Sequence, residues 1–255
     1  MVRRVKLEAL VGIKLIEPGD DLGAIAVAAL ATNGLTPEDG DVLVVAQKIV
    51  SKAEGRFVDL ATVKPSAQAI ALAADVDKDP RLVEVILSES VRVVQTRRGV
   101  LIVEHRLGFI MANAGVDQSN VAPKDGSAHV LLLPENPDRS AEALRRGLAK
   151  TTGIDVAVVI NDSFGRPWRL GTVGVAIGVA GLPALVDLRG RPDLFGRKLE
   201  ASVIGFADEV AAAASLVMGQ ADEALPAALI RGLSWSASES RAASIVRSPN
   251  EDLFR

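Results

Sequence analysis

Short apolar runs alternate with amphipathic stretches along the whole chain, and the two spacings predict strands and helices. Apolar runs bounded by turn residues predict strands at residues 5–11, 41–46, 91–96, 100–103, 129–133, 155–160 and 172–179. Apolar positions three or four residues apart predict helices at residues 20–31, 66–75, 81–87, 140–151 and 206–218. The turn at residues 97–99 predicts that its two flanking strands form a hairpin. The chain is long enough to bury one sizeable core or two coupled ones.

Turn and cap residues predict where several of these elements end. Asp20 and Asp21 predict the N-cap of the first helix, and Asn33 with Gly34 predicts its end. Prolines between residues 134 and 137 predict a break before the helix at 140–151. Four glycines between residues 171 and 181 predict that another backbone approaches this strand closely. The tail from residue 234 is expected to supply a further strand or a cap.

Composition and charge exclude several functional classes. The 255-residue chain has a formal net charge of -3 with interspersed signs, which argues against a surface dedicated to nucleic acid or membranes. It contains no cysteine, so disulfides, thiolate metal sites and cysteine nucleophiles are excluded. The start of the sequence, residues 1–6, lacks the apolar segment of a secretory signal, and no uncharged apolar stretch is long enough for a membrane span. We therefore expect a soluble, cytoplasmic protein.

Two aspartates follow apolar runs inside dense polar motifs. Asp117 belongs to the segment 113–120, which reads NAGVDQSN, and Asp162 belongs to the segment 161–169, which reads NDSFGRPWR. A carboxylate in a loop after a buried strand, among neutral oxygens, suits a hard divalent cation and the phosphates that it neutralises. Arg166 and Arg169 would add clamps for phosphate or carboxylate. The alternative for these motifs is ordinary turn chemistry, which favours Asn and Asp.

Basic residues and short polar loops offer candidate phosphate contacts. No Walker loop or dinucleotide fingerprint occurs, so phosphate binding would need another device. Lys48 and Lys52 follow a predicted strand and lie four residues apart, so on a helix they would share one face and, with the helix N-terminus, meet an anion. A solvated basic face is the alternative. The segments 12–16 (GIKLI) and 219–223 (GQADE) are weaker candidates, which a strand-to-loop bend and a helix C-cap would also explain.

The remaining chemistry points to an oxygen-ligated metal. Two histidines in unrelated contexts argue against a histidine-ligated zinc site. Without cysteine or a Gly-x-Ser-x-Gly elbow, covalent acyl-enzyme chemistry has no clear nucleophile. Oxygen ligands alone favour magnesium or manganese. The segment 162–166 (DSFGR) is nearly repeated at 193–197 (DLFGR), so the two loops either face one pocket or resemble each other by coincidence.

Taken together, these motifs resemble one family, the coenzyme F-420 gamma-glutamyl ligases, which add glutamate to the deazaflavin precursor F-420-0. The resemblance runs over essentially the whole chain and rests on segments 12–16, 40–42, 48–56, 114–120, 162–169, 176–181, 207–209 and 218–222. It implies an α+β fold with mixed or antiparallel sheets. It also implies that residues 1–255 form a single unit of two intimately joined domains, and that two chains form an intertwined homodimer.

The resemblance further implies a GTP-dependent ligase that uses two divalent ions per site, magnesium or manganese, and also potassium. Asp117 and Asp162 match the ligands of the first metal, and Ser163 and Gln220 match positions that serve the second. With Lys52, the two aspartates would form the catalytic set. The positions that match GTP contacts are Gly12, Ile13, Lys14, Leu15, Gln47, Lys48, Lys52, Asn120, Val217, Met218, Gly219, Gln220, Ala221, Asp222, Glu223 and Ala224.

The implied reaction joins small molecules: F-420-0, L-glutamate and GTP. The γ-phosphoryl group of GTP would pass to the terminal carboxylate of F-420-0, and the glutamate amine would then attack the acyl phosphate. The protein would contribute positioning and charge neutralisation. An amide ligase acting on another carboxylate is one alternative. A non-catalytic nucleotide-binding homologue is another, although the presence of both Asp117 and Asp162 argues against it.

Overall fold

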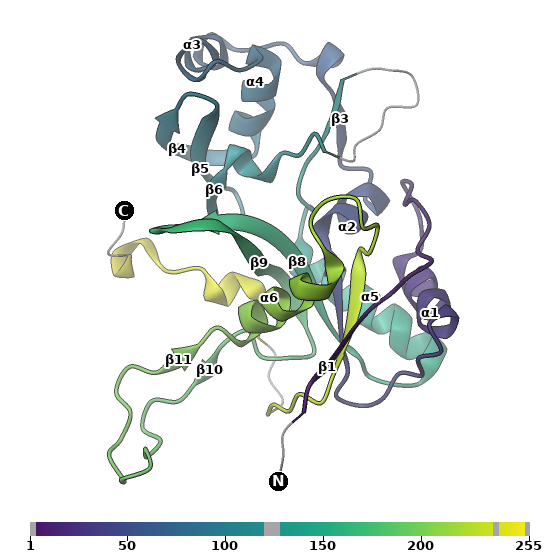
Figure 1. Cartoon of the computed structure of the whole chain (residues 1–255). Helices are drawn as coiled ribbons and strands as arrows, with labels where there is room; N and C mark the ends of the chain where they lie inside the picture. The colour runs from purple at the N-terminus through teal and green to yellow at the C-terminus, as the bar shows by residue number, and fades with distance from the viewer. Residues whose placement is uncertain (1–3, 120–127, 237–239, 253–255) are drawn as a thin grey trace.

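The computed structural model describes residues 4–119, 128–236 and 240–252, and its largest element is a five-stranded mixed sheet (Figure 1). The strands are, in spatial order, β1 (Lys6–Ala9), β12 (Ala227–Arg231), β2 (Val42–Ala46), β8 (Ala157–Arg166) and β9 (Arg169–Ala180). β2 and β8 are parallel, and the other neighbouring pairs are antiparallel. The apolar run of β2 is buried almost throughout, as expected for a central strand covered on both faces.

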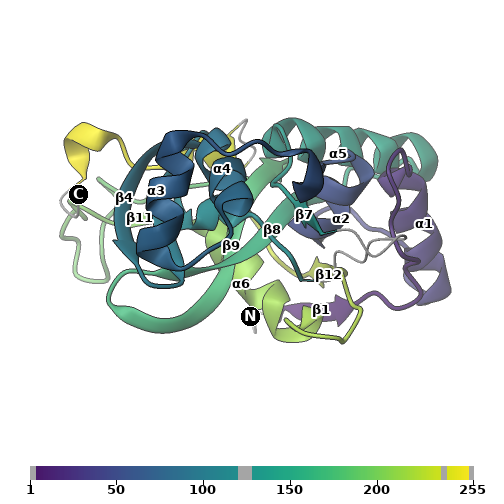
Figure 2. The same cartoon turned by 90° about the horizontal axis from the view of Figure 1, so that it is seen from above.

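Helices cover both faces of this sheet (Figures 1 and 2). α1 (Leu22–Thr32) and α5 (Pro137–Thr152) pack on one face, and α6 (Phe206–Met218) packs on the other. Alternating side chains of β8 enter the two cores: Val158 lies in a cluster with Leu144 of α5, and Val159 in a cluster with Ala211 of α6. A Cβ on Gly174 of β9 would overlap the Ala211 carbonyl. The close backbone approach predicted from the glycines is therefore confirmed.

A second group of elements lies above the main sheet in Figure 1 and has its own apolar core. It contains β3 (Phe57–Asp59), α3 (Ala67–Val76), α4 (Pro80–Ser88), β4 (Ser90–Arg97), β5 (Val100–His105), β6 (Ile110–Ala112) and β7 (His129–Leu131). The predicted hairpin is confirmed, because β4 pairs with β5 in antiparallel register. Val83, Ile86 and Leu101 are fully buried in this core. We call residues 57–116 with β7 the upper unit.

Side-chain caps confirm most of the predicted helix ends. Asp21 accepts a hydrogen bond from the Ala24 N–H at the start of α1, and Asn33 is its C-cap. The predicted start of α5 at residue 140 is wrong, since the helix begins at Pro137. Asn136 caps this helix, and a proline is tolerated in its first turn because its missing N–H would have no partner there.

The strands β8 and β9 extend beyond their apolar runs. Their antiparallel ladder continues from Val158 to Arg166, so Asp162 lies within a strand and the prediction of a loop after the strand is wrong. The pairing satisfies the backbone polar groups even where the side chains are polar. β12 was not predicted at all. The tail was expected to supply a strand or a cap, and its described part forms two 3-10 turns, η3 (Ala242–Ile245) and η4 (Pro249–Glu251), and no strand.

A two-stranded arm projects from the body between β9 and α6 (Figure 1). β10 (Val186–Asp187) pairs with β11 (Val203–Ile204), and beyond them Leu194 and Phe195 are 98% and 95% exposed. The DLFGR segment lies on this arm, so within one chain the alternative of a chance resemblance to residues 162–166 is favoured over that of a shared pocket. In the described residues, we find no helix that combines the length and the apolar character needed to cross a membrane.

Candidate active site

Four strand ends meet at one edge of the main sheet. β2 and β8 are parallel, with Ala46 opposite Asn161, so their carboxyl ends lie together. β12 is antiparallel to β2, so the loop before β12 reaches the same edge, where the Ala46 N–H donates to the Pro226 carbonyl at 2.8 Å. The end of β1 joins them because β1 is antiparallel to β12. The topology therefore brings together segments that are distant in sequence.

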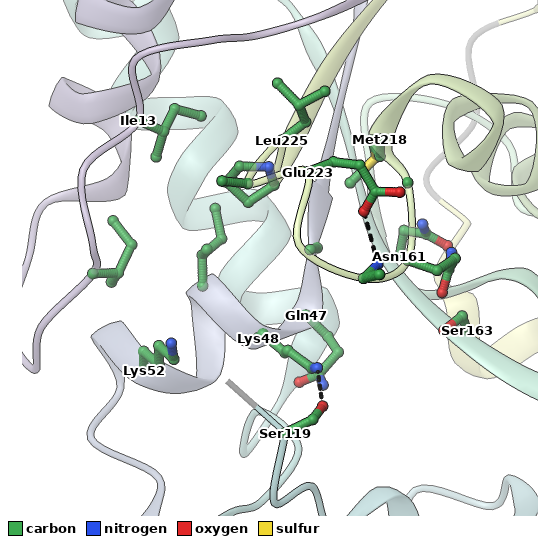
Figure 3. A pocket seen from close by; sticks show the side chains of 18 of the residues that line it. Ile13, Gln47, Lys48, Lys52, Ser119, Asn161, Ser163, Met218, Glu223 and Leu225 are labelled. Atoms are coloured by element: carbon green, nitrogen blue, oxygen red, sulfur yellow. Dashed lines mark hydrogen bonds between the residues drawn. The ribbon is translucent and has the colours of Figure 1, made fainter. Parts of the chain in front are cut away.

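These segments line a cavity of about 640 Å³, a size typical of small-molecule sites (Figure 3). Most of the residues implied by the family resemblance lie in its wall. They are Ile13, Lys14, Leu15, Gln47, Lys48, Lys52, Asp117, Asp162, Ser163, Met218, Gly219, Gln220, Ala221, Asp222, Glu223 and Ala224. Gly12 and Val217 do not line the cavity, although each precedes a wall residue. Asn120 lies outside the described residues.

Helix α2 (Gln47–Ala53) follows β2 directly and places two lysines in the cavity wall. The predicted shared face of Lys48 and Lys52 is confirmed. Lys48 is not a solvated surface residue, because its Nζ lies 2.7 Å from Asp117 Oδ2. The same Nζ donates to Ser119 Oγ at 2.8 Å (Figure 3). Burial, and then the nearby Lys48 ammonium, lower the pKa of Lys52. Gln47 is buried, and its side-chain oxygen accepts from the Ser51 hydroxyl at 2.9 Å.

Asp117 is held both by a backbone pairing and by turn chemistry. Its N–H donates to the Leu131 carbonyl at 2.9 Å, and its carbonyl accepts from the Leu131 N–H at 2.8 Å. Its Oδ1 accepts from the N–H and hydroxyl of Ser119 at 2.7 and 2.8 Å. The turn chemistry that was the alternative to a metal ligand is thus present, but it uses only one of the two carboxylate oxygens of Asp117. The other oxygen faces Lys48.

The backbone before Asp117 adopts an uncommon conformation. Asn113 and Ala114 have φ values of 52° and 53°, and Ala114 is fully buried. Left-handed backbone at a residue other than glycine is unfavourable and persists only where its surroundings impose it. The Asn113 side chain contributes to this, because its Oδ1 accepts from the Leu101 N–H at 3.2 Å. The upper unit therefore fixes the approach of Asp117 to the cavity.

Asp162 comes to the same cavity from β8. Its Oδ1 accepts from the Ser163 N–H at 2.8 Å. Burial raises the pKa of Asp162 to about 6; the Asp117 carboxylate acts in the same direction, and the Ser163 N–H and Lys48 ammonium oppose it. The two carboxylates are therefore close enough to repel each other. A cation beside both of them would offset that repulsion.

Asn161 was given no role in the sequence analysis, although it directly precedes Asp162. Its Nδ2 donates to the Ser215 hydroxyl at 3.0 Å, and that hydroxyl donates in turn to the Ala211 carbonyl at 3.0 Å. The Ser215 proton is thus used, and this fixes the orientation of the amide. Asn161 Oδ1 is buried and has no hydrogen-bond partner in the described part of the chain. Such an acceptor costs about 1–3 kcal/mol, so a water or bound group is expected beside it.

The donor chemistry of the wall fits a hard divalent ion. Among the described residues, no group of three or more His, Cys, Asp and Glu side chains gathers at one point. The available donors are instead the carboxylates of Asp117 and Asp162 and the neutral oxygens of Ser163, Gln220 and Asn161. An oxygen-only set of this kind suits magnesium or manganese.

The two predicted arginine clamps are not part of the cavity wall. Arg166 donates to the Gly171 carbonyl at 3.2 Å within the β8–β9 hairpin. Arg169 is exposed on the same hairpin. The hairpin carries both guanidinium groups beyond the strand ends that form the cavity, because its ladder continues after Asp162.

Comparison with known proteins decides the family. The family model described as F420-0:Gamma-glutamyl ligase matches residues 11–232, a span that contains every wall segment of the cavity. This chain belongs to that family. The family match confirms the resemblance that the sequence motifs predicted. The members of this family are ligases.

Individual relatives match this chain along nearly its full length. It is 46% identical over 253 residues to the coenzyme F420:L-glutamate ligase of Methanothermobacter thermautotrophicus, covering 98% of this chain and 99% of that protein. It is 47% identical over 244 residues to the protein of the same name from Methanopyrus kandleri, and the match covers 94% of this chain and 93% of that protein. It is 43% identical over 252 residues to the coenzyme F420:L-glutamate ligase of Archaeoglobus fulgidus, and the match covers 99% of this chain and 97% of that protein.

Proposed function

We propose that this protein is a GTP-dependent ligase that adds L-glutamate to coenzyme F-420-0 through an acyl phosphate, releasing GDP and phosphate. One observation carries the proposal: two carboxylates, two lysines and the loop before β12 converge on a single cavity in a member of the F420 ligase family. The loop and the lysines suit a phosphate chain. The carboxylates suit the divalent ions that accompany such a chain.

The nucleotide contacts are assigned to α2 and to the loop between α6 and β12. Lys48 and Lys52 would hold phosphate oxygens through their ammonium groups. In the loop, Gly219 has φ 72° and leaves room for the Glu223 carboxylate, which accepts from the Ala221 N–H at 2.7 Å. The two lysines and the loop would thus face one anion from two segments of the chain.

The metal ligands are assigned to the ends of β8 and of the Asp117 segment. Asp117 and Asp162 would hold a first divalent ion, and Ser163 and Gln220 would serve a second. When bound, these ions would offset negative charge on the phosphates and polarise the transferred phosphoryl group. A potassium requirement is also proposed, and replacing potassium with sodium in the assay tests it.

In the proposed reaction, an oxygen of the acceptor carboxylate attacks the γ-phosphorus of GTP. The bond from that phosphorus to the bridging oxygen breaks, and GDP leaves with the electron pair. The glutamate amine then attacks the acyl carbon, phosphate leaves, and one amine proton is released. Lys52 would stabilise the charge that develops on the phosphoryl oxygens, while the two aspartates would keep the phosphates and the acceptor in line.

The experiment that tests this function is product mass after incubation with F-420-0, GTP, L-glutamate and Mn²⁺. Mass increments of glutamyl units that require both the metal and GTP are expected. GDP without a glutamylated product would favour a ligase acting on another carboxylate. The absence of GDP formation would favour a non-catalytic homologue and would contradict the proposal.

The aspartates provide a sharper test of the metal assignment. We expect Asp117→Asn and Asp162→Asn to lower turnover by at least a hundredfold while the thermal unfolding temperature stays near that of the unchanged protein. Both changes preserve side-chain size and remove one negative charge. Near-normal turnover in either variant would contradict the assignment.

We also propose a homodimer, on the evidence of apolar side chains that the single chain leaves uncovered. Leu194 and Phe195 on the arm, and Trp168 and Leu170 on the β8–β9 hairpin, are each at least 86% exposed. Exposed apolar groups on projecting segments are typical of protein contacts. Sedimentation analysis of the unchanged protein should give twice the chain mass, and Phe195→Ser should shift it toward the monomer. A monomer at all concentrations would contradict this.

A further inference from the structure

The ammonium of Lys48 lies where a cation would contact Asp117. It is 2.7 Å from Asp117 Oδ2, and the Ser119 hydroxyl accepts from it at 2.8 Å. Ser119 also occupies the other oxygen of Asp117, to which its N–H and hydroxyl donate. Both oxygens of the carboxylate are therefore engaged in the described structure, one of them by a full positive charge.

A divalent ion and this ammonium group compete for the same oxygen. Lys48 and Asp117 have side chains that are only 30% and 23% exposed, so solvent screens their charges less than it would at the surface. Two cations that contact one carboxylate oxygen repel each other strongly at such short distances. A metal ion that approaches Asp117 must therefore displace Lys48.

Rotation about its side-chain bonds would let Lys48 leave Asp117 without a movement of the backbone. Its side chain is a flexible four-carbon stem, and it projects from the first turn of α2 into a cavity that Lys52 also lines. A phosphate chain in this cavity would offer the ammonium new oxygens at the moment when it leaves Asp117. Nucleotide binding would thus free the carboxylate for the metal.

We propose that Lys48 acts as a placeholder for the divalent cation in the free protein, so that metal and GTP bind with positive coupling. The inference rests on the proposed function, because it requires a metal at Asp117 and phosphates in the same cavity. Coupling of this kind is reciprocal: the factor by which GTP strengthens metal binding equals the factor by which metal strengthens GTP binding. Lys48 would contribute to that factor because its ammonium group leaves Asp117 when it binds the phosphate oxygens.

The test is the binding of Mn²⁺, measured by electron paramagnetic resonance of the free ion, with and without a non-hydrolysable GTP analogue. Lys48→Met should bind Mn²⁺ at least tenfold more tightly than the unchanged protein when nucleotide is absent. The analogue should then tighten Mn²⁺ binding by a smaller factor than in the unchanged protein. Lys48→Gln provides a second neutral variant, and thermal unfolding checks that each variant is folded.

Two further variants control for charge. Lys48→Arg keeps the positive charge, so its Mn²⁺ affinity without nucleotide should stay near that of the unchanged protein. Lys6 of β1 does not line the cavity, and its ammonium lies 2.8 Å from Glu8. Lys6→Met therefore removes the same charge without releasing Asp117, and it should leave Mn²⁺ affinity within about twofold.

The outcomes separate this inference from the function on which it rests. If the unchanged protein binds Mn²⁺ and both neutral Lys48 variants bind it no more tightly, the placeholder role is overturned and the metal site stands. An equal gain in Lys6→Met would also overturn it, since the effect would then be one of general charge. If the unchanged protein binds no Mn²⁺ with or without the analogue, the metal assignment and this inference both fail.

Discussion

Replacing Glu89 should reveal how the upper unit is joined to the main sheet. This carboxylate is 8% exposed and follows the end of α4. It lies 3.0 Å from Arg56 Nη2 and 3.0 Å from Arg106 Nε. His105 Nε2 is 3.5 Å from it, and since His105 Nδ1 accepts from the Leu107 N–H, the proton of the neutral ring is assigned to Nε2.

This cluster supports the segment that positions Asp117. Arg56 follows α2, its Nε donates to the Leu133 carbonyl at 3.0 Å, and its backbone carbonyl accepts from the Leu132 N–H at 3.0 Å. Leu131, the preceding residue, is the backbone partner of Asp117. Glu89 therefore stabilises the strand next to the cavity although it does not line the cavity itself.

The magnitude follows from the titration of the carboxyl group. Burial raises the pKa of Glu89, but His105, Arg106 and Arg56 outweigh burial and lower it to about 2 from 4.5. The His105 contact is too long for a strong hydrogen bond, so we attribute most of the lowering to the two guanidinium groups. Because the pKa of this carboxyl is lower in the folded state than in the unfolded state, the free energy of unfolding rises with pH between about 2 and 4.5. The contribution is about 3 kcal/mol near pH 7 and about 1 kcal/mol near pH 3.

The assay is urea unfolding of the unchanged protein and of Glu89→Gln at both pH values. The variant should lose about 3 kcal/mol of unfolding free energy near pH 7, and the loss should shrink by about 2 kcal/mol near pH 3. Glu135→Gln is the matched control, because its backbone carbonyl accepts from Arg106 while its side chain is exposed, so it should lose little at either pH. An equal loss for Glu89→Gln at both pH values would refute the electrostatic reasoning.

Two further predictions concern the packing of α6 and the reactivity of the cavity wall. Gly174→Ala should lower the free energy of unfolding by about 1–3 kcal/mol, since a Cβ would overlap the Ala211 carbonyl; Gly165→Ala, with open space around it, should change it little in the same urea assay. Equal losses would contradict the packing argument. Burial and Lys48 lower the pKa of Lys52, so an amine-acylating reagent near neutral pH should label Lys52 faster than the solvent exposure of its amine alone predicts. Bound GTP should slow this labelling. Peptide mass spectrometry measures both rates, with the exposed Lys150 as reference, and labelling that GTP does not slow would contradict the nucleotide assignment.

Local sequence determined the elements whose causes are local. Asp21 and Asn33 mark the ends of α1, and the apolar run of β2 predicts a buried strand, because caps and periodicity act within a few residues. α6 has the predicted bounds, Phe206–Met218, since its alanine-rich sequence favours a buried helix. The aspartate motifs also predicted oxygen chemistry, because residue type alone decides which ligands are available.

Tertiary structure decided where those residues meet. The antiparallel ladder with β9 carries β8 past its apolar run and places Asp162 within a strand. Pairing with β1 and β2 defines β12, and that pairing brings the loop at residues 219–226 to the cavity. The ion pair between Lys48 and Asp117 joins residues 69 positions apart across two cores. Strand pairing and charge contacts depend on partners that are distant in the chain. A local sequence pattern can therefore identify the candidate residues, but only the fold determines which of them are neighbours.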